Sequence, residues 1–207
     1  MKQLLIFPYS GTGLEALDCL GDRWDCVGFV SDDLTIIGQK MYGITVYSRD
    51  VIKKYSKASI LAVNGSPSSF RKREEIINSL QISRERFATV IHPSSNISTS
   101  AKIGINVLIM AGAVITFNAN IGNHVVVLPN TVIHHDSQIG DYTLIAGNAT
   151  IAGNVIVGKN CYIGASSSIK NEIHVADYTL VGMGANVISS NYQPDVLVGN
   201  PAKPLSS

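Results

Sequence analysis

One short segment of the sequence, His134-His135-Asp136, places two histidines directly before a carboxylate. A neutral imidazole accepts a proton readily near pH 7, and an adjacent carboxylate can hold its ring in one tautomer. We therefore predict that His135 is a general base and that Asp136 orients it. His134 is a candidate substrate contact. The alternatives are that Asp136 only forms a turn and that His134 is an ordinary surface residue.

These residues lie inside a repeat of six residues. Ile or Val stands at seventeen consecutive sixth positions, from Ile91 to Val187. The residue two places before each is small in nearly every unit, and Ile173 is the bulky exception. A helix needs a period of 3.6 and an ordinary strand a period of two, whereas a period of six is typical of a parallel β-helix.

The repeat predicts where each side chain points. In one unit Thr131 and Ile133 face inward, and the last two residues turn a corner, often as Asn or Gly, which tolerate positive φ. Three short strands and three corners give a coil of roughly 18 residues. His135 and Asp136 form one corner pair. The same corner one coil later contains Gly153, which predicts open space beside His135 for a flat group.

Residues 1–90 follow a different pattern. Apolar runs at residues 2–8, 25–33 and 58–65 predict strands, and helices are expected at residues 14–20 and 70–80. A strand, a glycine turn, a helix and a second strand are typical of a Rossmann-like half, whose ligand lies at the carboxyl ends of the strands. We expect an α/β Rossmann-like domain at residues 1–90, an all-β parallel β-helix at 91–190 and a tail at 191–207.

Two polar features of residues 1–90 have alternative interpretations. The turn Ser10-Gly11-Thr12-Gly13 could bind a ligand or could serve chain geometry alone. The basic run Arg71-Lys72-Arg73 could neutralise a diphosphate, but such a run more often forms a solvated face.

Composition limits the function classes. The hydrophobic content is 45%, the charged content 15% and the net charge +1, which is typical of a globular protein and gives no electrostatic reason to bind nucleic acid or an anionic membrane. The three cysteines are scattered without a CxxC motif, so we expect no disulfide framework and no metal. The apolar start is too short for a signal peptide or a membrane span, and we expect a cytoplasmic protein without membrane insertion.

The repeat is similar to that of the left-handed β-helix acyltransferases, which implies a left-handed coil. The whole chain resembles the sugar acetyltransferase family that includes the sialic acid O-acetyltransferases and the bacillosamine and perosamine N-acetyltransferases. Four motifs carry this resemblance: the pair His135-Asp136, the glycine loop at residues 8–14, the acidic pair Asp32-Asp33 and the terminal segment at residues 198–203. The sequence departs from the family at Leu14 and Leu144, where the family has histidines.

The resemblance implies two substrates, acetyl-CoA and a nucleotide-linked amino sugar, with no metal. Small residues along the coils would contact the cofactor: Gly153, Gly164, Ala165, Gly182 and Gly184. Pro201 and Lys203 of the terminal segment would contact it as well, and so would Leu144, at the position of the family's second histidine. The loops of the first domain would contact the nucleotide sugar, through Ser10, Gly11, Thr12, Gly13, Asp32 and Asp33. A homotrimer with active sites between its subunits is also implied.

The function implied is acetyl-CoA-dependent N-acetylation of a nucleotide-linked 4-amino-4,6-dideoxy sugar, by direct attack. O-acetylation of a sialic or related nonulosonic acid is the first alternative. Others are a non-catalytic nucleotide-binding scaffold, acylation from an acyl carrier protein, and a γ-type carbonic anhydrase. That last class binds zinc through three histidines, and the spacing of the five histidines here does not match it.

Overall fold

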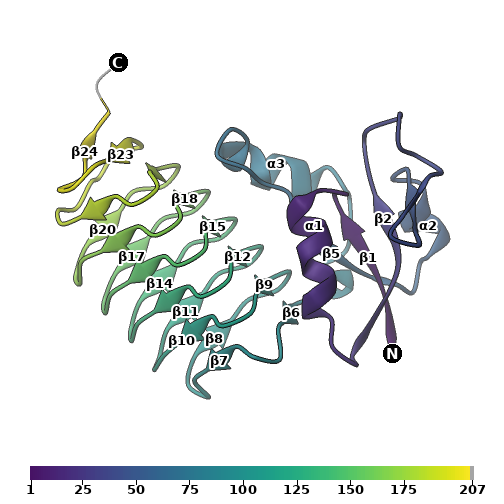
Figure 1. Ribbon diagram of the computed structural model, residues 1–207, viewed down its shortest axis with the longest axis horizontal. Coiled ribbons are helices and arrows are strands. Elements are labelled where there is room, and N and C mark those ends of the chain that lie inside the picture. Colours follow the sequence, from purple (N-terminus) through teal and green to yellow (C-terminus); the bar gives the residue numbers. More distant parts are fainter. Residues whose placement is uncertain (206–207) are drawn as a thin grey trace.

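Residues 90–187 form a parallel β-helix with three faces in the computed structural model, which describes residues 1–205 (Figure 1). The first face contains β6 (Val90–Ile91), β9 (Leu108–Ile109), β12 (Val126–Val127), β15 (Leu144–Ile145), β18 (Tyr162–Ile163) and β21 (Leu180–Val181). The second contains β7 (Asn96–Ile97), β10 (Val114–Ile115), β13 (Val132–Ile133), β16 (Thr150–Ile151), β19 (Ser168–Ile169) and β22 (Asn186–Val187). The third contains β8 (Lys102–Ile103), β11 (Asn120–Ile121), β14 (Gln138–Ile139), β17 (Ile156–Val157) and β20 (His174–Val175).

The coils stack in the register that the repeat predicts. Ile133 of β13 pairs with Ile115 of β10 on one side and with Ile151 of β16 on the other, so three units of the repeat make one coil. Thr131 and Ile133 are fully buried, and the Ile and Val columns form one continuous core. The strict period, the parallel pairing and this inward column fit the left-handed β-helix that the resemblance implied.

The corners adopt the backbone conformation expected of Asn and Gly, but other residues occupy it as well. Positive φ angles occur at Asn118 (55°) and Asn154 (58°), and also at Asp136 (59°), His124 (60°) and Tyr142 (62°). Aspartate and histidine enter this region more readily than most residues, whereas tyrosine does so at a steric cost.

The N-terminal part is a five-stranded sheet in the order β3-β4-β2-β1-β5. Its strands are β1 (Lys2–Phe7), β2 (Trp24–Val30), β3 (Lys40–Met41), β4 (Ile44–Tyr47) and β5 (Ser59–Ala62). All neighbours are parallel except β3 and β4, which are antiparallel. The helices are α1 (Gly11–Glu15), α2 (Val51–Lys54) and α3 (Arg73–Asn78), with short 3₁₀ turns η1 (Ala16–Cys19), η2 (Phe70–Lys72) and η3 (Arg84–Arg86).

The predicted strands and helices of this part correspond to β1, β2, β5, α1 with η1, and η2 with α3. α1 begins at Gly11 rather than at Leu14, because the Ser10 side chain caps it by accepting a hydrogen bond from the Gly13 N–H (3.1 Å). Strands β3 and β4 and helix α2 lie outside the ranges for which strands and helices were predicted. The Rossmann-like assignment of residues 1–90, and the domain boundaries, stay predictions.

The first face of the β-helix is covered by the N-terminal part, with α1 and α3 lying beside it (Figure 1). Outward side chains on this face are apolar and buried, as Leu108, Val126 and Leu144 show. They pack in one cluster with Leu4 and Ile6 of β1. An unbroken series of apolar or aromatic residues at the outward position of this face, from Val90 to Leu180, is therefore the sequence signal for which face is covered.

Two buried polar side chains fasten this junction. The amide of Asn106 donates to the Ala62 carbonyl (2.9 Å) and accepts from the Ala62 N–H (2.8 Å). Arg73 is fully buried and donates to the carbonyls of Tyr142 (2.7 Å) and His124 (2.6 Å). The expectation that residues 71–73 form a solvated face is therefore wrong for Arg73, because its guanidinium satisfies corner carbonyls of two successive coils.

The chain ends with β23 (Val196–Val198), which pairs parallel with β21, and β24 (Lys203–Pro204), which pairs antiparallel with β23. Residues 206 and 207, the end of the predicted tail, lie outside the described residues. Within residues 1–205, none of the helices combines the length and hydropathy needed to cross a bilayer.

Candidate active site

His135 and Asp136 lie at the corner between the second and third faces, directly after β13. Asp136 has a positive φ, and its Oδ2 lies 2.8 Å from Nδ1 of His135. The two side chains are 56% and 38% exposed, so the pair is accessible to a ligand. This geometry is the predicted one: a carboxylate on Nδ1 makes that nitrogen the donor and leaves Nε2 to accept a proton.

Asp136 has a second partner that the sequence did not reveal. Nδ2 of Asn118, one coil earlier, donates to Oδ1 of Asp136 at 2.7 Å. This hydrogen bond, followed by that from His135, lowers the pKa of Asp136 below its ordinary value, so the carboxylate stays ionised. Asn118 occupies the same position in its coil as Asp136 does in the next, and this equivalence is the signal that could have identified it.

The expected open space beside His135 is filled by its own imidazole. A Cβ added at Gly153 would lie 2.6 Å from both Cε1 and Nε2 of His135. Glycine at this corner is therefore required by the ring, and the prediction of room for a flat ligand against Gly153 is wrong. In residues 1–205 the Gly153 N–H makes no backbone hydrogen bond, so this corner has a backbone donor available to a ligand.

His134 precedes the pair and is half-buried at the edge of the second face. Its backbone N–H donates to Ile151 in the next coil (2.9 Å), which holds it within the ladder. Its role as a substrate contact stays a prediction.

The N-terminal loop lies at the carboxyl end of β1, as predicted. Ser10 caps α1, and a Cβ at Gly13 would lie 2.5 Å from the Pro8 carbonyl, so the turn itself requires that glycine. A Cβ at Gly11 would meet nothing within 4 Å, so Gly11 faces open space where a ligand could approach the backbone closely. Thr12 follows within the same helical turn.

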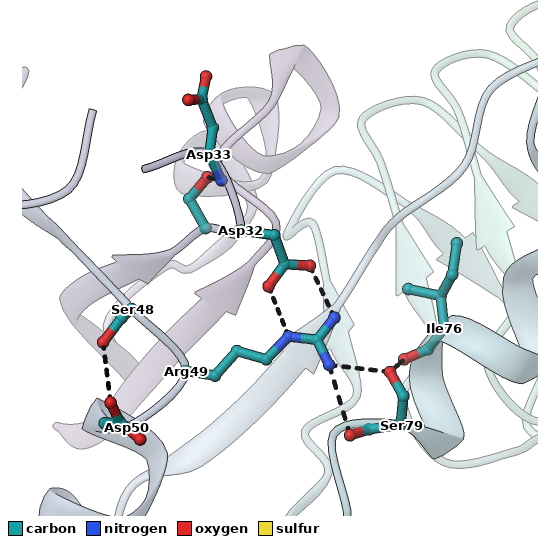
Figure 2. A network of polar contacts seen from close by, with 8 residues as sticks. Asp32, Asp33, Ser48, Arg49, Asp50, Ile76 and Ser79 are labelled. Carbon is teal, nitrogen blue, oxygen red and sulfur yellow. Dashed lines mark hydrogen bonds and ion pairs between the residues drawn. The ribbon is translucent and has the colours of Figure 1, made fainter. Parts of the chain in front are cut away.

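The two predicted acidic contacts differ in their partners (Figure 2). Asp32 is held by Arg49 through two bonds of 2.6 Å, and Arg49 also donates to Oγ of Ser79 (2.9 Å). Asp33 points away from Arg49 and accepts hydrogen bonds from the Thr35 hydroxyl and N–H, which lower the pKa of Asp33. Within residues 1–205 the Asp33 carboxylate is therefore not paired with a basic side chain, whereas a ligand that binds Asp32 would have to share its carboxylate with Arg49.

A cleft separates the first helical segment from the β-helix edge between the first and second faces. Glu15, Asp18 and His92 contribute its polar side chains, and Met110 lies on the β-helix side. Nδ1 of His92 is 2.8 Å from the Ser94 hydroxyl. The cleft thus combines two carboxylates with an apolar wall.

The predicted cofactor residues occupy several places. Gly153 lies on the same edge of the β-helix as His135. Four others lie on the edge between the first and second faces; these are Gly164, Ala165, Gly182 and Gly184. Gly184 has φ of +65°, and a Cβ at Gly164 would lie 2.6 Å from the Val181 carbonyl, so the coil alone explains both glycines. Pro201 and Lys203 are exposed in the terminal segment that folds back on β23.

Leu144 is 3% exposed in β15, in the cluster beneath the N-terminal part. The geometry of a single chain therefore gives no support to a cofactor contact at Leu144. Its leucine is explained by the junction that it fills.

No three His, Cys, Asp or Glu side chains within residues 1–205 are placed so that they could hold a metal ion. The buried His124 is committed elsewhere: its Nδ1 is 2.9 Å from Nδ2 of Asn106, and its ring stacks on Tyr142.

A family profile matches residues 87–198, more than half of the chain; the family is described as the GMPPB C-terminal domain. The chain belongs to this family. The matched region contains the whole β-helix, including the His135 corner. None of the curated proteins matches the sequence.

Solved structures extend the similarity beyond the GMPPB C-terminal domain to the whole chain. PerB from Caulobacter crescentus, in complex with CoA and GDP-perosamine, has a TM-score of 0.83 at 21% identity over 100% of this chain and 98% of its own. The acetyltransferase domain of PglB from Neisseria gonorrhoeae has a TM-score of 0.88 at 22% identity over 99% and 100%. WeeI from Acinetobacter baumannii has a TM-score of 0.83 at 24% identity over 99% and 100%. The resemblance to the bacillosamine and perosamine N-acetyltransferases is confirmed in the fold.

Proposed function

We propose that this protein is an acetyl-CoA-dependent N-acetyltransferase that acts on the amino group of a nucleotide-linked 4-amino-4,6-dideoxy sugar. The observation that carries the proposal is the His135 corner, where a carboxylate holds Nδ1 and the imidazole lies against Gly153, whose N–H makes no backbone hydrogen bond within residues 1–205. Its fold is shared over the full chain with PerB, a protein crystallised with CoA and GDP-perosamine.

The proposed reaction is a direct transfer. The amine nitrogen attacks the thioester carbonyl, the C–N bond forms and the C–S bond breaks. Nε2 of His135 takes the proton that the amine loses and returns it to the sulfur of CoA. Asp136 stabilises the imidazolium that forms between these events. The Gly153 N–H is a candidate donor to the carbonyl oxygen as negative charge develops on it.

The amino sugar is placed in the cleft beside Glu15 and Asp18, because carboxylates attract the ammonium form of the amine. The nucleotide would then extend toward the open backbone at Gly11 and the acidic residue Asp33. Leu14 is partly buried and packs against the apolar cluster of the junction.

The cleft and His135 lie on different edges of one β-helix, which supports a site built from two chains. In the homotrimer that we propose, the His135 edge of one subunit faces the cleft edge of its neighbour, and acetyl-CoA lies between them. The small residues Gly164, Ala165, Gly182 and Gly184 would line its path, with Pro201 and Lys203 near its nucleotide end. Such an arrangement also covers exposed faces of an open β-helix.

The decisive experiment measures CoA thiol release from acetyl-CoA with UDP-, dTDP- and GDP-linked 4-amino sugars and free sialic acid in parallel. We expect release with one amino sugar. His135→Gln should lower kcat by roughly 10²- to 10⁴-fold, because the base is lost, while binding of both substrates persists. In PerB, Ala and Asn variants of one histidine were crystallised with CoA and GDP-perosamine, so those variants still bind both molecules.

His174→Gln is the matched control, because His174 lies on the third face and stacks on Tyr192. It should retain full turnover. Release with sialic acid alone would replace the proposal by O-acetylation. The proposal would be contradicted if no acceptor gave CoA release, or if His135→Gln left turnover unchanged.

A further inference from the structure

A chain of hydrogen bonds runs along the edge that carries His135. The Ser100 hydroxyl accepts from the Asn118 N–H (2.9 Å), Asn118 Nδ2 donates to Asp136 Oδ1 (2.7 Å), and Asp136 Oδ2 faces His135 Nδ1 (2.8 Å). The Asp136 N–H also donates to the Phe117 carbonyl (3.0 Å). The two successive corners are thus joined through both backbone and side chain.

From this chain we propose that Asn118 is a positioning residue, which holds Asp136 so that one carboxylate oxygen is reserved for Nδ1 of His135. That Asn118 aids catalysis in this way rests on the proposed function. The effect of Asn118 on the His135 imidazole does not rest on that function, because it concerns only which ring nitrogen carries the proton.

The contacts of the carboxylate explain why a positioning residue is needed. Asp136 is 38% exposed, so water competes for both of its oxygens. A fixed donor on Oδ1 restricts rotation of the carboxylate and turns Oδ2 toward the ring. On the other side, the ring lies against Gly153, where an added Cβ would be 2.6 Å from Cε1 and Nε2. The imidazole is therefore held from both sides, with Nδ1 as donor and Nε2 as acceptor.

Formation of the corner does not by itself explain this contact. Three other corner asparagines have a similar positive φ, between 57° and 59°, against 55° for Asn118. Asn130 and Asn148 lie on the edge between the first and second faces, and Asn154 lies on the same edge as Asn118, two coils later. Within the described residues none of these three amides bonds to a side chain of the next coil. The corner accounts for the choice of Asn, but the bond to Asp136 needs the carboxylate that stands at the same corner one coil later.

The test compares Asn118→Gly and Asn118→Asp with Asn130→Gly. Glycine and aspartate both tolerate positive φ, so the corner is preserved, while the donor to Asp136 is lost. Nitrogen-15 NMR reports the tautomer of His135, and carboxyl carbon-13 NMR reports the titration of Asp136. Thermal unfolding confirms that each variant is folded.

In the unmodified protein we expect the Nδ1–H tautomer to dominate. Both Asn118 variants should populate the other tautomer, and the titration of Asp136 should move to higher pH, because the hydrogen bond that most lowers its pKa is gone. Asn130→Gly should change neither signal. Both Asn118 variants should also lose kcat by roughly ten- to a hundredfold, with little change in KM for acetyl-CoA.

An unchanged tautomer and an unchanged Asp136 titration in both Asn118 variants would overturn the proposal. If instead both NMR signals respond as expected but the unmodified protein releases no CoA with any acceptor, the positioning role stands and the proposed enzymatic function fails.

Discussion

At the scale of single residues, Gly153 explains how much the candidate base depends on its surroundings. A glycine is usually interpreted as a flexible or tightly turning position, but the φ of Gly153 is not positive, and its missing Cβ is what admits the imidazole of His135. The position of the ring is therefore decided by a residue one coil away.

The corresponding prediction concerns Gly153→Ala. The added methyl group would lie 2.6 Å from Nε2, so the ring must rotate away, and we expect turnover to fall roughly ten- to a hundredfold while the β-helix stays folded. Steady-state kinetics of a double-mutant cycle with His135→Gln is the check. If Gly153→Ala acts through the ring, it should lower turnover no further in the His135→Gln background. Equal losses of turnover in both backgrounds would contradict this.

At the scale of elements, the junction between β5 and the coil corners contains a histidine that must remain neutral. Nδ2 of Asn106 donates to Nδ1 of His124, because Oδ1 of the same amide accepts from the Ala62 N–H. Burial lowers the pKa of His124 from 6.5 to about 4, with Arg73 and Arg84 acting in the same direction and Asp141 and Glu74 opposing them.

Stability should therefore depend on pH through His124. The unfolded chain protonates this histidine below about pH 6.5, whereas the folded chain does so only near pH 4, so the free energy of unfolding should fall as the pH decreases across that window. The shift corresponds to a loss of about 3 kcal/mol at most. Urea unfolding at pH 7.5 and pH 4.5 measures it.

His124→Asn keeps a residue that tolerates positive φ, and its stability should change less between the two pH values than that of the unmodified protein. The comparison uses the pH difference within each variant, since the loss of stacking on Tyr142 lowers stability at both pH values. Equal pH differences in the two proteins would contradict the assignment to His124.

At the scale of the whole molecule, the candidate residues lie on two different edges of the β-helix. His135, Asp136 and Gly153 lie on one, and the cleft with Ala165 lies on the other. A single chain cannot bring these edges together, because its own second face separates them. In the homotrimer that we propose, the two edges come together between neighbouring subunits.

We expect light scattering to give a mass of about 66 kDa, three chains of 22.1 kDa. A sharper test mixes two inactive variants, His135→Gln and Ala165→Arg, after partial unfolding and reassembly. If each site uses one edge from each of two subunits, mixed trimers contain some sites with both edges intact and recover activity. Mixtures that stay inactive, with exchange of subunits verified by mass spectrometry, would contradict a shared site.

The sequence alone determined the β-helix, the three repeat units of each coil, the inward columns and the corner position of His135 and Asp136. These features follow from a local pattern repeated without interruption, in which each residue's place depends only on its phase. The same pattern could not reveal the partners of the polar side chains. Asn106 bonds to Ala62 and Asp32 to Arg49, and neither pair is related by the repeat.

Only the tertiary structure decided those pairings, and with them which residues are available to a ligand. Arg73 and Leu144 are buried because the N-terminal part covers the first face, and the space beside Gly153 is filled because the His135 ring turns toward it. Stacking and docking place side chains from distant segments within hydrogen-bond reach, and that proximity is a property of the folded chain, not of local residue order.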